Sequence, residues 1–246
     1  MMRDPSWSAE TPIQVPPAPT SGRDDAFSAE LRGFGPLGIF AMVAIVLTGN
    51  VFVGPMIVVP VGALLVLVWV VVSRTPWSAI GYVRPKSWML TFATGLAFGI
   101  AFKLLMKTIV MPLLGAPPIN QSYHFLAGNR ALLPAATWAM INAGFAEETV
   151  FRGYLFERLG RLFGSSVGAK TAIVLITATA FGFAHYSTQG IPGVEQSTIV
   201  GLLFGTVAAT TGSIIMLMIA HATFDLTALA MIYSNTEPTF AHLIFR

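Results

Sequence analysis

The sequence predicts an all-α fold, namely a polytopic bundle of helices that crosses a membrane. Of the 246 residues, 54% are hydrophobic and only 10% are charged, against roughly 25% charged residues in soluble domains. Seven apolar runs are also long enough, or nearly so, to cross a bilayer as helices. The runs cover about 35–53, 56–73, 88–111, 131–150, 169–186, 196–211 and 213–233. We therefore predict about seven transmembrane helices, with eight, or one re-entrant segment, as the alternative.

The N-terminal residues differ in composition from the rest of the chain. Residues 1–32 are polar and rich in proline and serine, and they lack the charged and apolar regions of a signal peptide. We predict a disordered tail over 1–32 and a single transmembrane domain over 33–246. The sequence has no cysteine, which excludes disulfides, thiolate metal ligands and cysteine nucleophiles.

Basic residues indicate how the chain is oriented in the membrane. The loop at 74–86 and the segment at 152–170 both carry lysine and arginine, which favour the cytoplasmic side. The N-terminus is then cytoplasmic as well. The brevity of the chain is typical of a prokaryotic protein, so we expect an integral protein of a prokaryotic inner membrane.

Two lysines interrupt the third apolar run with a spacing of four residues. We interpret Lys103 and Lys107 as snorkelling side chains, whose ammonium groups reach the outer interface of the membrane. The alternative is a buried pair of charges that faces a cavity.

A group of charges follows the fourth apolar run. Glu147 and Glu148 are adjacent, and Arg152 follows four residues after Glu148, so Glu148 and Arg152 share one face of a helix and can pair. Glu147 is rotated by about 100° from that face and can point into a cavity. Because charged residues within a membrane are costly, they indicate a functional site.

Two further apolar runs each carry a histidine. His185 ends the fifth run, and His221 lies in the seventh run with Asp225 four residues later. In a bilayer each such polar group needs a partner. We therefore predict that the two histidines, the three acidic residues and the arginine form one cluster.

This set of side chains is suited to hydrolysis. A carboxylate that binds a water, with a histidine beside it, can act as a general base, and further donors can stabilise the oxyanion. The same side chains could instead bind Zn²⁺, with Glu147, His185 and His221 as ligands and water in the open position.

Three motifs in the chain resemble those of the CPBP family, the intramembrane endopeptidases that include CAAX prenyl protease 2 and lysostaphin resistance protein A-like proteins. The motifs are Glu147-Glu148-x-x-x-Arg152, Phe181-x-x-x-His185 and His221-x-x-x-Asp225. Their order and their placement on separate apolar helices carry the resemblance, which covers about residues 130–230.

The resemblance implies catalytic roles for four residues. Glu147 activates the water with the help of His185, and His221 and Asp225 form the oxyanion site. An aspartate can donate a hydrogen bond there only when it is protonated, whereas some family members have asparagine at this position.

The resemblance implies supporting roles for three more residues, since Glu148 and Arg152 order the site and Phe181 packs beside it. The family has been described both as glutamic and as metal-dependent proteases. We expect no cofactor, because no His-Glu-x-x-His motif is present and zinc ligands would have to come from three separate helices.

The expected partners are the lipid bilayer and a membrane-associated protein or peptide substrate. No nucleic-acid signature is present. Two rival functions remain at this point: a non-catalytic binding or regulatory membrane protein, for example in bacteriocin immunity, and a proton-coupled transporter with an acid–histidine relay.

Overall fold

The computed structural model describes residues 22–49, 51–52 and 58–245, and it confirms the all-α prediction. The described part also contains one antiparallel pair of two-residue strands, β1 (Val51–Phe52) and β2 (Val58–Val59). The α-helices are α1 (Gly22–Arg32), α2 (Pro36–Thr48), α3 (Val61–Val72), α4 (Trp88–Leu105), α5 (Met111–Leu113), α6 (Leu133–Glu148), α7 (Leu155–Phe163), α8 (Val167–Ala184), α9 (Tyr186–Thr211), α10 (Ile215–Tyr233) and α11 (Glu237–Ala241). Two 3₁₀ turns, η1 (Trp77–Ile80) and η3 (His124–Leu126), and two π-helical segments, η2 (Met106–Val110) and η4 (Thr149–Tyr154), complete the set.

Each of the seven apolar runs contains a helix, but the helices differ in length. Within the described residues, four continuous helices are long and apolar enough to cross a membrane: Trp88–Leu113, Val167–Ala184, Tyr186–Thr211 and Ile215–Tyr233. The pair α1–α2, bent by 57°, adds a fifth candidate span. Helices α3 and α6 have only 12 and 16 residues. The chain is thus an integral membrane protein, while the number of seven spans stays a prediction.

The prediction of a disordered tail over residues 1–32 is wrong for residues 22–32, which form α1. Tertiary contacts hold this helix. Trp69 Nε1 of α3 donates a hydrogen bond to Leu31 O (3.2 Å), and the buried Arg158 of α7 donates to the last carbonyl of α1 (2.7 Å). The polar composition gives no sign of these contacts. The prediction for residues 1–21 lies outside the described residues.

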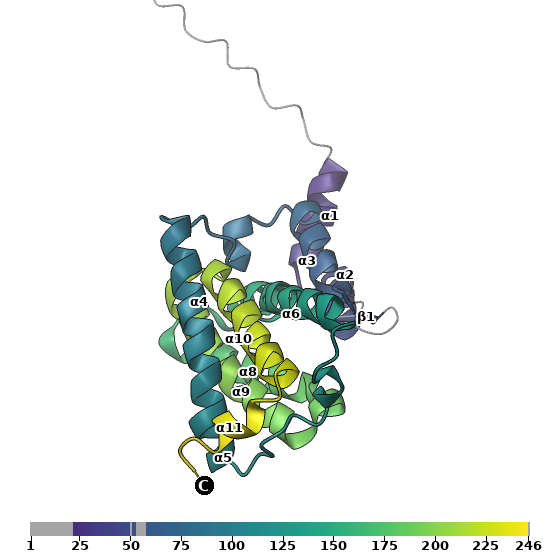
Figure 1. The fold of residues 1–246 in the computed structure, drawn as a ribbon. Coiled ribbons are helices and arrows are strands. Elements are labelled where there is room, and N and C mark those ends of the chain that lie inside the picture. The colour runs from purple at the N-terminus through teal and green to yellow at the C-terminus, as the bar shows by residue number, and fades with distance from the viewer. Residues whose placement is uncertain (1–21, 50, 53–57, 246) are drawn as a thin grey trace, which may run out of the picture.

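Helix α10 occupies the centre of the bundle. It packs along α4 on one side and along α6 on the other, as Figure 1 shows. Helices α8 and α9 form a hairpin that turns at His185. Buried phenylalanines of α4, α8, α9 and α10 fill the space between these helices. The acidic end of α6 and the histidine of α10 are therefore brought together by direct helix packing.

The close approach of α6 and α10 depends on Gly144. A Cβ atom at this position would lie 2.4 Å from the backbone nitrogen of Ala222, which is closer than any normal contact. Because backbone cannot move aside as a flexible side chain can, a larger residue must push the two helices apart.

We expect Gly144→Ala to destabilise the protein by about 1 to 3 kcal/mol through overpacking. Gly160→Ala is a matched control, since a Cβ at Gly160 in α7 would meet nothing within 4 Å and alanine is the better helix former. Thermal unfolding in detergent should show a lower midpoint for the first variant only. Equal midpoints would mean that α6 and α10 can separate without cost.

The interpretation of Lys103 and Lys107 as snorkelling residues is wrong, because both side chains are buried. Lys103 Nζ donates to Gln196 Oε1 (3.0 Å). Lys107 Nζ donates to Glu237 Oε1 (2.8 Å) and to Pro118 O (2.8 Å). The segment after α5 and the helix α11 supply the partners of Lys107 in η2, and α9 supplies the partner of Lys103 in α4. Such non-local contacts leave no signal in the apolar run itself.

Candidate active site

The first motif lies where α6 changes into the π-helical segment η4. Glu147 and Glu148 are the last residues of α6, and Arg152 lies within η4. Arg152 Nη1 donates to Glu148 Oε1 at 2.8 Å, and both side chains are almost inaccessible to solvent. This is the pairing that the four-residue spacing predicts. Short π-helical segments occur frequently at functional sites.

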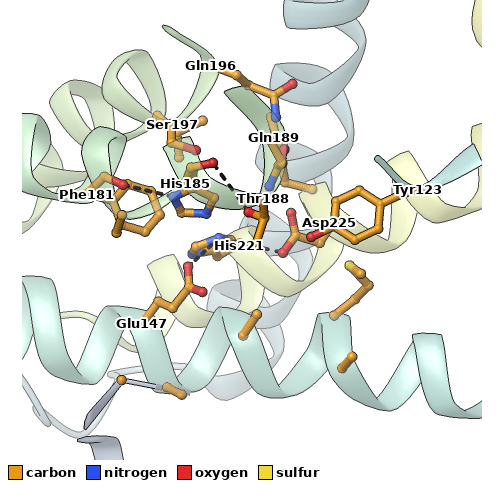
Figure 2. A pocket seen from close by; sticks show the side chains of 18 of the residues that line it. Tyr123, Glu147, Phe181, His185, Thr188, Gln189, Gln196, Ser197, His221 and Asp225 are labelled. Carbon is orange, nitrogen blue, oxygen red and sulfur yellow. Dashed lines mark hydrogen bonds and ion pairs between the residues drawn. The ribbon is translucent and has the colours of Figure 1, made fainter. Parts of the chain in front are cut away.

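His221 of α10 connects the two glutamates to Asp225. Its Nδ1 lies 2.8 Å from Glu148 Oε1, while its Nε2 lies 3.8 Å from Glu147 Oε2 and 3.7 Å from Asp225 Oδ2. Figure 2 shows Glu147 and Asp225 on either side of the imidazole ring. Three carboxylates from two helices thus converge on one histidine.

His185 marks the corner between α8 and α9. Its Nδ1 lies 2.8 Å from Phe181 O. Because a carbonyl oxygen can only accept, Nδ1 must carry the hydrogen, and Nε2 of the neutral ring is then an acceptor. His185 can therefore accept a hydrogen bond from a water in the cavity.

The buried ring of Phe181 contacts both histidines. Its ring makes edge contacts with His185 (4.8 Å between centroids) and His221 (5.9 Å). The guanidinium of Arg152 lies over the same ring, 4.4 Å from its centre, which is the geometry of a cation–π contact. Phe181 therefore contacts side chains from all three motifs.

The site faces a cavity of about 420 Å³. Five of the residues selected from the sequence line it: Glu147, Phe181, His185, His221 and Asp225. Glu148 and Arg152 lie buried behind this wall. The structure thus brings all seven together, while their individual roles stay a prediction.

Several polar cavity residues were missed by the sequence reasoning. Among them are Tyr123, Thr188, Gln189, Gln196 and Ser197, which Figure 2 labels. They come from the loop before η3 and from the first turns of α9, and no motif or spacing pointed to them. Only the short sequence distance of Thr188 and Gln189 from His185 could have suggested any of them.

Tyr123 is a hydrogen-bond donor for the site at any ordinary pH. Burial, together with the charges of Asp225 and Glu147, raises the pKa of its phenol to about 12, while a hydrogen bond with Gln189 lowers it to a smaller extent. All the larger effects disfavour the phenolate, so the phenol keeps its proton through the ordinary pH range.

We expect Tyr123→Phe to lower the rate of the site's reaction by about 2- to 10-fold, the effect of one neutral hydrogen bond. The reaction rate of the unchanged protein should show no inflection from tyrosine ionisation up to about pH 11. Rate–pH profiles of both proteins provide the measurement. If the rate of the unchanged protein falls at high pH below about 11, and this fall is absent in Tyr123→Phe, the phenol ionises at a lower pH than expected.

The zinc alternative requires three side chains whose ligand atoms can reach one metal ion. Within the described part of the chain, no group of three acidic or histidine side chains has the arrangement needed to hold one metal ion. The three ligands named from the sequence, Glu147, His185 and His221, therefore do not fit a zinc site in this arrangement.

The described residues thus form a helical membrane protein in which an acid–histidine cluster faces an internal cavity. Residues 129–227 match the family model described as Type II CAAX prenyl endopeptidase Rce1-like. This segment contains all three motifs, so the match confirms their recognition as those of a CPBP-type protease. The matched segment is thus similar to a family of CAAX-protease-like membrane peptidases. Neither the curated proteins nor the solved structures include a significant match.

Proposed function

We propose that this protein hydrolyses a peptide bond in a membrane-associated protein or peptide, with Glu147 as the general base for the attacking water. The observation that supports this most directly is the different setting of the two adjacent glutamates. Glu148 is fully buried, whereas the side chain of Glu147 is 18% exposed and lines the cavity. The carboxylate of Glu148 thus has a structural role, whereas the carboxylate of Glu147 can contact a substrate in the cavity.

Glu148 serves the site by fixing its neighbours. Its Oε1 is 2.8 Å both from Arg152 Nη1 and from His221 Nδ1. Because the carboxylate accepts from Nδ1, the ring of His221 is held with Nε2 toward Glu147 and Asp225. Glu148 and Arg152 are therefore positioning residues.

The reaction needs a base that takes a proton from the attacking water and later gives it to the leaving amine. Glu147 takes a proton from the water as its oxygen attacks the carbonyl carbon, and His185 Nε2 accepts the other hydrogen and orients the water. When the tetrahedral intermediate collapses, the C–N bond breaks, and Glu147 returns the proton to the leaving amine. The products are a carboxyl group and an amine.

The developing oxyanion needs hydrogen-bond donors in the cavity wall. Nε2 of His221 and Oδ2 of Asp225 are 3.7 Å apart, and either can donate only while it holds a proton. Since closely spaced groups titrate together, the proton belongs to the pair. We assign the oxyanion site to this pair.

The test compares the termini of all membrane proteins and peptides in cells that carry the chain with those in cells that carry Glu147→Ala. We expect new termini that depend on Glu147, and these would also name the substrate. Identical termini with an expressed and folded variant would refute the protease proposal and favour a binding or regulatory role. Repeating the cleavage with a chelator separates a metal-dependent from a glutamic mechanism.

A further inference from the structure

A second, smaller cavity adjoins the proposed active site. Its volume is about 130 Å³, and three of its lining residues, Asn120, Gln189 and Gln196, also line the larger cavity. Both buried lysines of this part of the bundle, Lys103 and Lys107, line its wall. The two cavities thus share one boundary, and the smaller one is the more cationic.

The two lysines differ in how their charge is balanced. Lys107 is paired with the buried Glu237 at 2.8 Å. Lys103 has no carboxylate within 4 Å among the described residues. Its ammonium donates to the neutral Gln196 at 3.0 Å and lies 4.6 Å from the centre of the Phe224 ring. The charges of Asp225 and Glu237 attract the ammonium from beyond ion-pair distance, so Lys103 has no carboxylate in direct contact.

A buried ammonium without a direct ion pair is costly, because it loses its water and more distant carboxylates offset only part of that loss. Its three N–H groups also allow more hydrogen bonds than the one made to Gln196. An anionic oxygen bound in the smaller cavity would supply both the missing charge and a further acceptor.

We propose that the smaller cavity is a subsite for a carboxylate of the bound peptide, with Lys103 as its anchor and Gln196 as the residue that orients Lys103. The carboxylate can be a C-terminal group or an acidic side chain. This proposal rests on the peptidase function proposed above. A phosphate of a lipid headgroup shares the same anionic chemistry, but the shared wall with the active-site cavity favours a group that belongs to the peptide.

The test measures binding separately from cleavage. Glu147→Gln protein in phosphatidylcholine nanodiscs is offered three pools of octapeptides randomised over apolar residues. The first pool ends in a free carboxylate, the second is amidated, and the third is amidated and contains one glutamate. Mass spectrometry quantifies the retained peptides. We expect the two acidic pools to be retained about 10- to 100-fold more than the neutral pool, the effect of one charge-assisted hydrogen bond.

Replacing Lys103 by methionine in the same protein should reduce this ratio to about one, whereas Lys103→Arg should keep most of it. Lys170→Met, at an exposed position of α8, is the matched control and should leave the ratio unchanged. Thermal midpoints confirm that each variant is folded, and Gln196→Leu replaces Lys103→Met if that variant does not fold. Equal retention of all pools, or a ratio that survives Lys103→Met, would overturn the proposal.

Two further arms separate the possible sources of failure. If phosphatidylglycerol in the nanodiscs removes the preference for acidic peptides in a way that depends on Lys103, the subsite belongs to a lipid headgroup and the peptide proposal is wrong. Cleavage of the same pools by the unchanged protein is measured in parallel. Glu147-dependent cleavage without any acidic preference keeps the peptidase function and rejects the subsite. Retention of acidic peptides without cleavage rejects the peptidase function alone.

Discussion

Glu147→Gln is expected to slow peptide-bond cleavage by about 100- to 10,000-fold, the usual contribution of a general base. Glutamine keeps the size of the side chain and its place in the cavity wall, but its amide cannot take a proton from water. The measurement is the cleavage rate of the substrate found by the comparison of termini, with enzyme in excess so that a single turnover is observed.

The fold should survive this change, because the side chain of Glu147 is partly exposed to the cavity. A thermal midpoint within a few degrees of the unchanged protein is the expected control result. Glu30→Gln, at an exposed position of α1, should leave the rate unchanged. A Glu147→Gln rate close to that of the unchanged protein would move the role of base to another residue.

Arg152→Met is expected to destabilise the protein by about 3 to 5 kcal/mol, because it leaves Glu148 buried without its cation. Both side chains of the pair are almost fully inaccessible, so water cannot replace the lost partner. For a chain of this size the thermal midpoint should fall by roughly 6 to 20 °C. Cleavage should also be lost, since Glu148 positions the ring of His221.

A double variant separates the cost of an unpaired charge from the loss of packing. Glu148→Gln combined with Arg152→Met removes both charges, and such replacements of a buried pair are often nearly neutral for stability. We expect the midpoint to recover most of its loss while cleavage stays low, because glutamine holds the imidazole less firmly. A double variant as unstable as Arg152→Met would show that the guanidinium acts mainly through its contact with Phe181.

The sequence by itself determined the local features of the fold and the site. Apolar runs of this length allow few structures other than helices in a membrane. The four-residue spacing of Glu148 and Arg152 predicts their contact, because it follows from the geometry of one helix. The convergence of three motifs from separate helices could also be predicted, since isolated ionisable groups are costly in hydrocarbon.

Only the tertiary structure decided how segments distant in sequence cover one another. Residues 22–32 form a helix because Trp69 and Arg158, far along the chain, bind its carbonyls. Lys103 is buried because Gln196 and Phe224, far along the chain, pack against it. Such contacts depend on how the helices pack against one another. Packing between helices produces no repeating pattern of apolar and polar residues that could be recognised in the sequence. The sequence therefore determined which residues could react, and the packing decided which of them share a cavity.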